Sequence, residues 1–431
     1  TDVGSAITLT NGWDAVATNL SLPNATNQAD VDIRIIMTSN TSISGSGIGN
    51  GGGAWVGIDN VVVSGNTIFY SQGTGNLATL SNWNTIRTGG GYSPTSMTAN
   101  YQTFVIQNGH TITAAATLTL GTSSIIEIES GGILTETNAI TIPATGTLQV
   151  DNGGTLNHNV NSATIFGGTV SIGTSTSIVN YGYAGAQNVF ATTYGNLTLS
   201  GSGAKTTTGA IVNSTLSREG TATATGTIPT YGASSTIQYK GSAAQATGIE
   251  LPATVNNLTI NNTSGVTLSG STTIIGTLDL QQGALSLNGN TLTINGDISR
   301  TGVGTGTITG SSTSSLIING NGALNNLYFT NATENLNDFT LNRVGSNISL
   351  SSNLTLAGTL ALTNGIISAT GKTISLTNSA AASLTAGIGS YIDGTISRAM
   401  TNAGGTYVFP VGSTCGSHWL TFSSVSGTST T

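Results

Sequence analysis

Residues 126–134 read Ile-Glu-Ile-Glu-Ser-Gly-Gly-Ile-Leu, and positions 148–156 repeat this pattern as Leu-Gln-Val-Asp-Asn-Gly-Gly-Thr-Leu. The short run before them repeats at the same spacing, with residues 117–120 (Thr-Leu-Thr-Leu) matching residues 139–142 (Ala-Ile-Thr-Ile). A period of about 22 residues, built from short alternating strands that end at Gly or Asn, is typical of one turn of a parallel β-solenoid. The sequence therefore predicts an all-β protein: a right-handed parallel β-solenoid (β-helix) flanked by partial β-sandwich or jelly-roll segments.

The composition is unusual for a folded protein. Charged residues make up only 6% of the 431 positions, and 60 residues are glycine, whereas ordinary soluble domains are about 25% charged. Nevertheless Ile, Leu and Val recur at every second position through most of the chain, which disordered segments do not show. We therefore expect a folded chain whose polar surface consists of Thr, Ser and Asn side chains.

Charge and cysteine content exclude several classes of function. The net charge is −7 and only nine residues are Lys or Arg, so the attraction that drives nucleic-acid binding is missing and no nucleic-acid partner is expected. No apolar stretch approaches the roughly 20 residues that span a bilayer, so no membrane insertion is expected. Cys415 is the only cysteine, which excludes an intramolecular disulfide. Low charge with many Thr and Asn residues favours an extracellular, cell-surface location.

The chain divides into four segments of different character. Residues 1–66, with the run Ile-Asp-Asn-Val-Val-Val at 58–63, are expected to be the C-terminal half of a jelly-roll-like β-sandwich. Residues 67–106 are expected to be a connector and a cap for the solenoid. The solenoid itself, with internal repeats, is placed at residues 107–398. Residues 399–431 are interpreted as the start of a following β domain that is truncated.

A longer repeat is superimposed on this short period. Residues 257–260 (Asn-Leu-Thr-Ile) recur as 338–341 (Asp-Phe-Thr-Leu), and residues 276–280 recur as 358–362 at nearly the same spacing. In each unit the aliphatic residues alternate with Thr and therefore share one face of a strand. The predicted core is a stack of aliphatic side chains inside a stiff, protease-resistant shaft.

Several of these runs resemble the repeat regions of known surface proteins. Residues 194–199 (Tyr-Gly-Asn-Leu-Thr-Leu), 236–241 (Thr-Ile-Gln-Tyr-Lys-Gly) and 103–112 (Thr-Phe-Val-Ile-Gln-Asn-Gly-His-Thr-Ile) are similar to repeats in large, adhesin-like secreted surface proteins of Bacteroidota. The resemblance covers most of residues 67–412. It implies a parallel β-helix in an exported protein, carried by the type IX secretion route, and its motifs specify architecture better than activity.

Acidic residues gather in the two matching turns. Glu129 and Asp151 occupy equivalent positions of the two copies and should stack on adjacent turns, close enough for a calcium site or for a carboxylate pair with a raised pKa. With Glu127 and Glu136 they form a cluster of the kind that parallel β-helix polysaccharide lyases and glycosidases carry on one face, where two carboxylates about 5–9 Å apart suit glycoside hydrolysis. However, Gln149 interrupts the row beside Glu127, and no basic residue lies nearby to act as a lyase base. Catalysis is therefore not expected, and calcium or solvated charge remain the two interpretations of the cluster.

Two further groups of residues carry candidate functions. Trp13 and Trp55 lie in the predicted sandwich and could stack on sugar rings, although filling the sandwich core is the alternative. His158 falls close to the acidic turns and is interpreted either as a member of that cluster or as a surface residue at a corner.

The sequence as a whole predicts an extracellular structural or adhesive protein, a stalk or fibre segment of a large bacterial cell-surface protein. It predicts no catalytic residues and no cofactor, with calcium at Glu129 and Asp151 left open. Expected partners are other copies of the chain in fibres, other surface proteins and carbohydrate. The alternative function is a carbohydrate-binding or polysaccharide-degrading β-helix protein.

Overall fold

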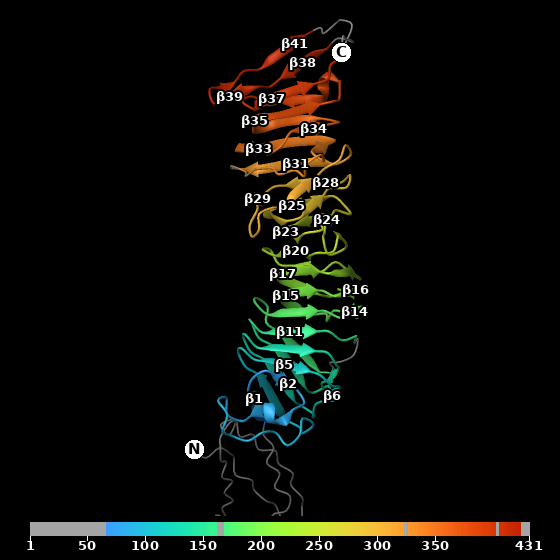
Figure 1. The fold of residues 1–431 in the computed structure, drawn as a ribbon, viewed down its shortest axis with the longest axis vertical. Coiled ribbons are helices and arrows are strands. Elements are labelled where there is room, and N and C mark those ends of the chain that lie inside the picture. The colour runs from blue at the N-terminus through green and yellow to red at the C-terminus, as the bar shows by residue number, and fades with distance from the viewer. Residues whose placement is uncertain (1–65, 162–167, 323, 325, 402–404, 424–431) are drawn as a thin grey trace, which may run out of the picture.

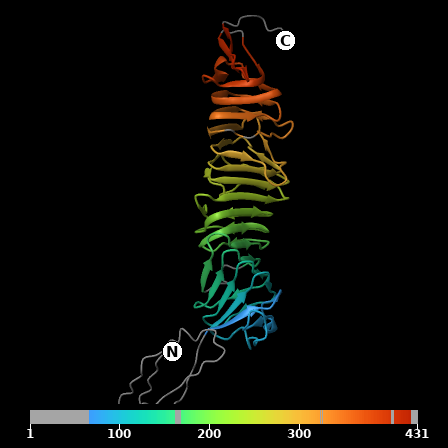
Figure 2. The ribbon, with the colours of Figure 1, turned by 90° about the vertical axis from the view of Figure 1, so that its left-hand side faces the viewer.

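The computed structural model describes residues 66–161, 168–322, 324, 326–401 and 405–423, and these form an elongated rod. The rod is a parallel β-solenoid of about 13 turns, nearly all β, which confirms the predicted fold. Strand β1 lies at one end and strand β41 at the other (Figure 1), and a view turned by 90° shows the same narrow outline (Figure 2). The sandwich predicted for residues 1–66 lies outside the described residues, which begin at Asn66.

Three large sheets run along the rod, and nearly all of their strands pair in parallel with the turn before and the turn after. The first sheet has the order β12 (Thr169–Ile172), β10 (Thr147–Val150), β7 (Ile125–Ile128), β4 (Gln102–Ile106), β1 (Thr67–Ser71) and β3 (Trp83–Asn84). The second contains β2 (Gly75–Asn76), β5 (Thr111–Ala114), β8 (Ile133–Glu136), β11 (Thr155–His158), β13 (Ile178–Tyr181), β15 (Thr193–Leu199), β17 (Ile211–Glu219), β20 (Thr236–Gly241), β23 (Asn257–Asn262), β26 (Thr277–Gln282) and β29 (Asp297–Ser299), with β19 (Thr230–Tyr231) beside β17. The third contains β22 (Thr254–Val255), β25 (Thr272–Ile274), β28 (Thr291–Ile294), β31 (Ser315–Asn321), β33 (Asp338–Ser349), β35 (Leu360–Leu376), β34 (Leu354–Leu356) and β32 (Asn335–Leu336), with β36 (Leu384–Ala386) and β37 (Tyr391–Arg398) beside β35.

Short strands complete the turns. They are β21 (Gln245–Ala246), β24 (Val266–Thr267), β27 (Ala284–Ser286) and β30 (Thr307–Thr309) in one sheet, β14 (Gln187–Asn188), β16 (Ser202–Thr206) and β18 (Thr221–Thr225) in another, and the pair β6 (Leu118–Thr119) and β9 (Ile140–Thr141). Two single-turn 3₁₀ helices, η2 (Leu80–Asn82) and η3 (Ala381–Ser383), lie near the two ends of the rod. In this described portion no helix has the length and apolar character needed to cross a bilayer.

The doubled stretch forms adjacent turns, as its short period predicts. Leu148 pairs with Ile126 and Val150 with Ile128 in one sheet, and Leu156 pairs with Leu134 in the other. All of these side chains are buried in one apolar cluster that extends along the rod. Because side chains alternate along each strand, a constant register between turns places every aliphatic residue above its equivalent.

The glycine pair in each copy has a geometric cause. Gly131 and Gly153 have φ values of +77° and +85°, a region that other residues rarely occupy. A Cβ atom on Gly131 would lie 2.1 Å from Oδ1 of Asn108, and one on Gly153 would lie 2.3 Å from Oγ of Ser130. The turn conformation therefore favours glycine, and a side chain there would also displace the Asn108 or Ser130 side chain of the preceding turn.

The longer repeat does not place equivalent units above one another. Residues 257–260 belong to β23 in the second sheet, whereas their copy at 338–341 belongs to β33 in the third sheet. In the sequence repeat Leu341 corresponds to Ile260. In the structure, however, following the strand pairing from Leu341 through the preceding turns ends at Val255. The intermediate partners are Ile318, Ile294 and Ile274. The copied units are therefore out of step with the turns, and each lies on a different side of the rod.

Antiparallel pairs occur at both ends of the described rod. At the first turn β3 pairs antiparallel with β1, and Trp83 is buried there with its Nε1 donating to the carbonyl of Leu77 at 2.9 Å. At the last turn the hairpin-like pairs β38 (Thr406–Phe409) with β41 (Leu420–Ser423) and β39 (Gly412–Ser413) with β40 (Gly416–Ser417) lie over β37. Arg398 holds this segment through the carbonyl of Val408, and Tyr407 donates to the carbonyl of Ser379.

The aliphatic stack makes a prediction about stability. Leu292 is completely buried in β28, whereas its neighbour Thr293 points outward and has no side-chain hydrogen bond in the described portion. Replacing Leu292 by Ala should cost about 2–5 kcal/mol, because it removes buried methyl groups and leaves a cavity. The matched change Thr293→Ala should alter stability by less than about 0.5 kcal/mol. Urea unfolding followed by circular dichroism would measure both, and equal shifts of the midpoint would contradict the assignment of faces.

Candidate functional site

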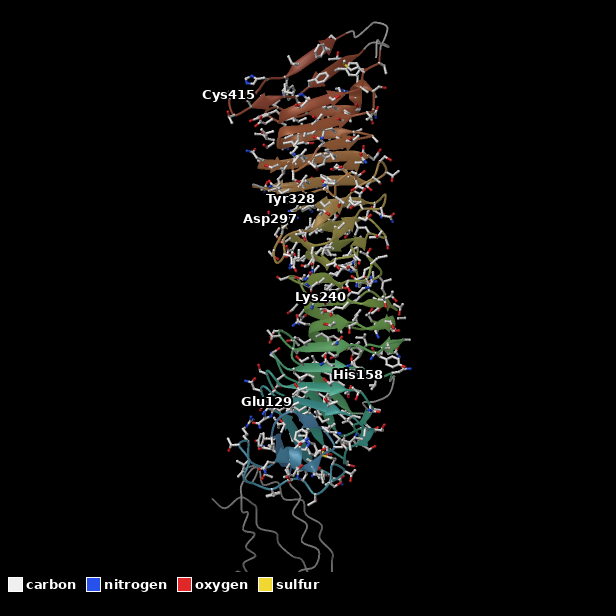
Figure 3. All side chains as sticks on the ribbon, viewed as in Figure 1. Glu129, His158, Lys240, Asp297, Tyr328 and Cys415 are labelled. Carbon is white, nitrogen blue, oxygen red and sulfur yellow. The ribbon has the colours of Figure 1, made fainter. Side chains whose placement is uncertain are left out.

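The predicted acidic pair lies on the surface near the first turns, where Figure 3 labels Glu129. Glu129 and Asp151 directly follow the paired strands β7 and β10, so they occupy the neighbouring positions that the repeat predicts. Arg87 forms a two-pronged ion pair with Glu129, in which Nη1 lies 3.0 Å from Oε2. Asp151 accepts a hydrogen bond of 2.8 Å from Gln149. The expectation that no basic residue lies nearby is wrong, because Arg87 reaches this face from the first turn, a distant part of the sequence.

Glu127 lies on β7, close to these partnered carboxylates, and pairs in register with Gln149 of β10. Partial burial, followed by the negative charges of Asp151 and Glu129, raises the pKa of Glu127, and the Arg87 charge opposes this shift. Within the residues that the structure describes, no group of three or more His, Cys, Asp and Glu side chains is arranged to hold a metal ion. The assignment of calcium to Glu129 and Asp151 stays a prediction, as does carbohydrate stacking by Trp13 and Trp55, which lie outside the described residues.

Glu136 and His158 do not belong to this surface. They pair with each other in register on β8 and β11, both are fully buried, and Nδ1 of His158 is hydrogen-bonded to Oε2 of Glu136. Burial raises the pKa of Glu136, and the bond to His158 opposes that shift. The predictions of Glu136 in an outward acidic cluster and of His158 at a surface corner are therefore wrong. The reason is alternation, since both residues lie two positions after a buried leucine and so point inward.

The same inward position carries polar side chains over several turns. From β5 to β23 the register aligns one residue from each turn at this position: Ala114, Glu136, His158, Tyr181, Leu199, Arg218, Tyr239 and Ile260. The expectation of a purely aliphatic stack therefore fails here. The buried polar groups at this position are instead hydrogen-bonded to other side chains: Glu136 to His158, Tyr181 to Tyr194, and both Arg218 and Tyr239 to Glu250.

Arg218 is the centre of a buried polar network. Its Nη1 lies 2.8 Å from Oε1 of Glu250, and the same oxygen accepts a 2.8 Å hydrogen bond from the hydroxyl of Tyr239. Both charged side chains are almost completely buried. Tyr231 adds a 2.6 Å hydrogen bond to the main-chain carbonyl of Glu250. The contacts of the Glu250 side chain all converge on its Oε1, whereas its buried Oε2 has no hydrogen-bond partner among the described residues. Because the ion pair joins neighbouring turns in the interior, the network is suited to holding turns in register.

Lys205 forms a second buried polar link. Its Nζ donates to the carbonyls of Tyr183 and Gly185, at 2.6 and 3.0 Å, and to Oε1 of Gln187 at 2.8 Å. Burial lowers the pKa of Lys205 to about 8. The lysine therefore ties the strand β16 to the preceding turn.

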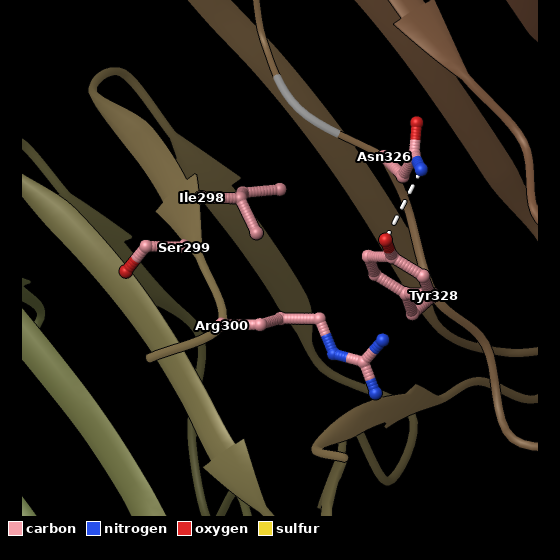
Figure 4. Close-up of a pocket in the computed structure, with 5 residues that line it drawn as sticks. All are labelled: Ile298, Ser299, Arg300, Asn326 and Tyr328. Carbon is pink, nitrogen blue, oxygen red and sulfur yellow. Dashed lines mark hydrogen bonds between the residues drawn. The ribbon is translucent and has the colours of Figure 1, made fainter. Parts of the chain in front are cut away.

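A third group, which the sequence did not indicate, surrounds a shallow pocket of about 230 Å³. Ile298, Ser299 and Arg300 line it from one turn, and Asn326 and Tyr328 line it from the next part of the chain (Figure 4). The Arg300 guanidinium carbon lies 3.7 Å from the centre of the Tyr328 ring. The sequence signal was an arginine directly after a short Asp-Ile-Ser strand, which by itself is uninformative.

No protein-family model, no curated protein and no solved structure matches this chain. Its function must therefore be argued from the fold and from the surface and interior groups described above.

The buried ion pair gives a second stability prediction. Replacing Glu250 by Ala leaves Arg218 buried without its carboxylate and should cost about 3–5 kcal/mol. The matched control is Lys240→Ala, because Lys240 forms an exposed ion pair with Glu219 at 3.4 Å and its side chain is 52% exposed. That change should cost no more than about 1 kcal/mol. Thermal and urea unfolding would check both variants, and a Glu250→Ala variant as stable as the parent would show that the network does not hold the turns.

The raised pKa of Glu127 predicts a pH-dependent effect of its substitution. A carboxyl group whose pKa is higher in the folded chain than in the unfolded chain destabilises the fold once it ionises. Glu127→Gln should therefore stabilise the protein at pH 7. The gain should shrink as the pH falls through the raised pKa and vanish below the ordinary glutamate value of about 4.3. Melting temperatures between pH 3 and 8 test this, and a gain that grows toward acid pH would have the wrong sign.

Proposed function

We propose that this chain is a structural segment of an extracellular bacterial surface protein, serving as a stalk or fibre segment that carries adhesive contacts. One observation supports this most directly: the buried apolar residues form a single cluster from Phe69 to Ile392, from the first to the last turns of the rod. A continuous core makes the described chain one mechanical unit.

The dimensions suit a spacer. About 13 turns at the strand spacing of about 4.8 Å give a shaft roughly 60 Å long. The strands lie across the rod and their backbone hydrogen bonds run along it (Figure 1). Bending the rod would stretch hydrogen bonds in several sheets together, so the separation of its ends should be nearly fixed.

The outer surface suits exposure to solvent without many charges. Outward side chains of successive turns are hydrogen-bonded to one another: Asn157 donates to Thr135 at 3.3 Å, Asn180 to Asn157 at 3.4 Å and Ser200 to Asn180 at 2.6 Å. Such rows satisfy amide and hydroxyl groups along the shaft. Together with the resemblance to secreted repeat proteins of Bacteroidota, they support an extracellular setting.

Polysaccharide binding or degradation remains the second candidate. The observation in its favour is Glu127, a carboxyl group with a raised pKa beside two other carboxylates, as an acid catalyst requires. Against it, Glu129 is engaged by Arg87 and Asp151 by Gln149. A stalk role accounts for the full length of the rod. An enzymatic role would account only for one face of the few turns around Glu127.

The stalk proposal predicts a fixed distance between the ends. Cys415 is the only cysteine and is exposed at the last turn (Figure 3), so a spin label can be attached there. A second label at Ala116→Cys, exposed on an early turn, should give a narrow distance distribution centred at about 60–70 Å, roughly fourteen strand spacings. Double electron–electron resonance measures this distance.

A matched pair of labels controls for the position of the probe. Ala233→Cys is exposed about midway along the rod and should give a distance to Cys415 close to half of the first. Broad distributions at both positions would contradict a rigid spacer. Release of reducing ends from polysaccharides, lost in Glu127→Gln, would instead favour the enzymatic alternative.

A further inference from the structure

Arg300 differs from the other arginines that the structure describes. Its guanidinium has no hydrogen bond and no ion pair with any described residue, and its buried Nε lacks a partner. The others are all engaged: Arg87 with Glu129, Arg218 with Glu250, Arg343 with Asp297, and Arg398 with main-chain carbonyls. A buried N–H such as Nε of Arg300 is costly unless something accepts its hydrogen bond, and the terminal nitrogens of the half-buried guanidinium are free to donate to a ligand.

The surroundings of Arg300 supply complementary groups. Tyr328 stacks against the guanidinium at 3.7 Å, which fixes its plane while leaving its edge donors available. The Tyr328 hydroxyl accepts a 3.1 Å hydrogen bond from Nδ2 of Asn326 (Figure 4), so the hydroxyl proton and the Asn326 carbonyl oxygen remain unused in the described part of the chain.

The backbone that carries Arg300 is held rigidly. The Asp279 carboxylate, on the preceding turn, accepts hydrogen bonds of 2.9 Å from the Ser299 hydroxyl and from the Thr301 main-chain N–H. Gln281 donates a third at 2.9 Å. Burial acts to raise the pKa of Asp279, but these hydrogen bonds lower it overall, so the group stays ionised. The residues on both sides of Arg300 are thus fixed, and binding a ligand there would require little ordering.

We propose that Arg300, Tyr328 and Asn326 form a binding site for a carboxylate-bearing sugar, a hexuronate unit of an acidic polysaccharide. The planar fork of a guanidinium matches both oxygens of a carboxylate. The Tyr328 hydroxyl can donate to the same group, and the Asn326 carbonyl oxygen can accept from a sugar hydroxyl. A pocket of about 230 Å³ is smaller than the roughly 300–1,000 Å³ of sites for larger ligands, so it suits one sugar unit.

The overall negative charge of the chain does not prevent this contact. At physiological ionic strength charges are screened beyond about 8 Å, so local groups dominate. The nearby Asp297 is paired with Arg343 at 2.9 Å, and Asp279 is engaged with Ser299 and Thr301. The inference deepens the adhesive part of the proposed function and rests on it. If the sugar site proved absent, the distance between the two ends of the rod would be unchanged. The sugar site and the stalk role can therefore be tested separately.

Titration calorimetry with the full chain in 0.15 M salt tests the site. The probes are a tetramer of galacturonic acid and its methyl ester, which has the same sugar backbone without the charge. The acid should bind and the ester should not. Arg300→Ala should weaken binding of the acid by about tenfold or more, because hydrogen bonds to a charged group are lost. Arg300→Lys should also weaken it, since lysine keeps the charge but not the fork, and Tyr328→Phe should weaken it while preserving the ring stack.

Arg87→Ala is the matched control. Arg87 also lies over a tyrosine ring, 4.4 Å from the centre of Tyr70, but its guanidinium is already paired with Glu129. This variant should bind the tetramer as the parent does. Four results would each overturn the proposal. The first two are that the acid does not bind and that acid and ester bind equally well. The other two are that free acetate binds as tightly as the tetramer and that the Arg87 and Arg300 variants lose equal affinity. Unchanged melting of the Arg300 and Tyr328 variants confirms that they fold.

Discussion

The parallel hydrogen bonding between successive turns is the constraint on which the rest of the structure depends. A short strand of this solenoid cannot satisfy its own backbone N–H and C=O groups, so each turn needs the turns on both sides. Once the register is fixed, equivalent side chains must stack, and this produces the buried aliphatic cluster and the outward rows of Thr and Asn together. It also constrains the corners, where Gly131 and Gly153 have positive φ values that other residues rarely adopt.

The same constraint explains the buried polar networks. A charged side chain at an inward position has no access to water, so it survives only if a neighbouring turn supplies its partner. Arg218 is paired with Glu250 in this way, and Glu136 with His158. An aliphatic stack alone would tolerate a shift of one turn relative to another, since leucine and isoleucine pack similarly. Polar partners that occur on specific turns remove that freedom.

The sequence allowed the architecture to be predicted because the architecture depends on local periodicity. The short repeat placed Leu134 under Leu156 and Glu129 beside Asp151, and the structure has both arrangements. Side-chain partners were harder to predict because they come from corners and from other turns: Arg87 reaches Glu129, and Glu250 reaches Arg218, from distant parts of the sequence. For Glu136 and His158 the alternation that identified the buried leucines also specified an inward direction, but charge suggested the surface. The pocket at Arg300 and Tyr328 joins separate turns across loops of irregular length, which no period encodes.

The longer repeat, whose copies occupy different sheets, has a consequence for how such a shaft displays its surface. Because a block of this length is not a whole number of turns, a copied side chain faces a different direction around the rod axis from the original. Copies of one side chain are therefore distributed around the rod instead of forming a straight row. Lengthening the protein by such blocks would spread contact points over its whole circumference. A shaft of this kind could engage a surrounding matrix from any direction, at the expense of concentrating its contacts against one flat surface.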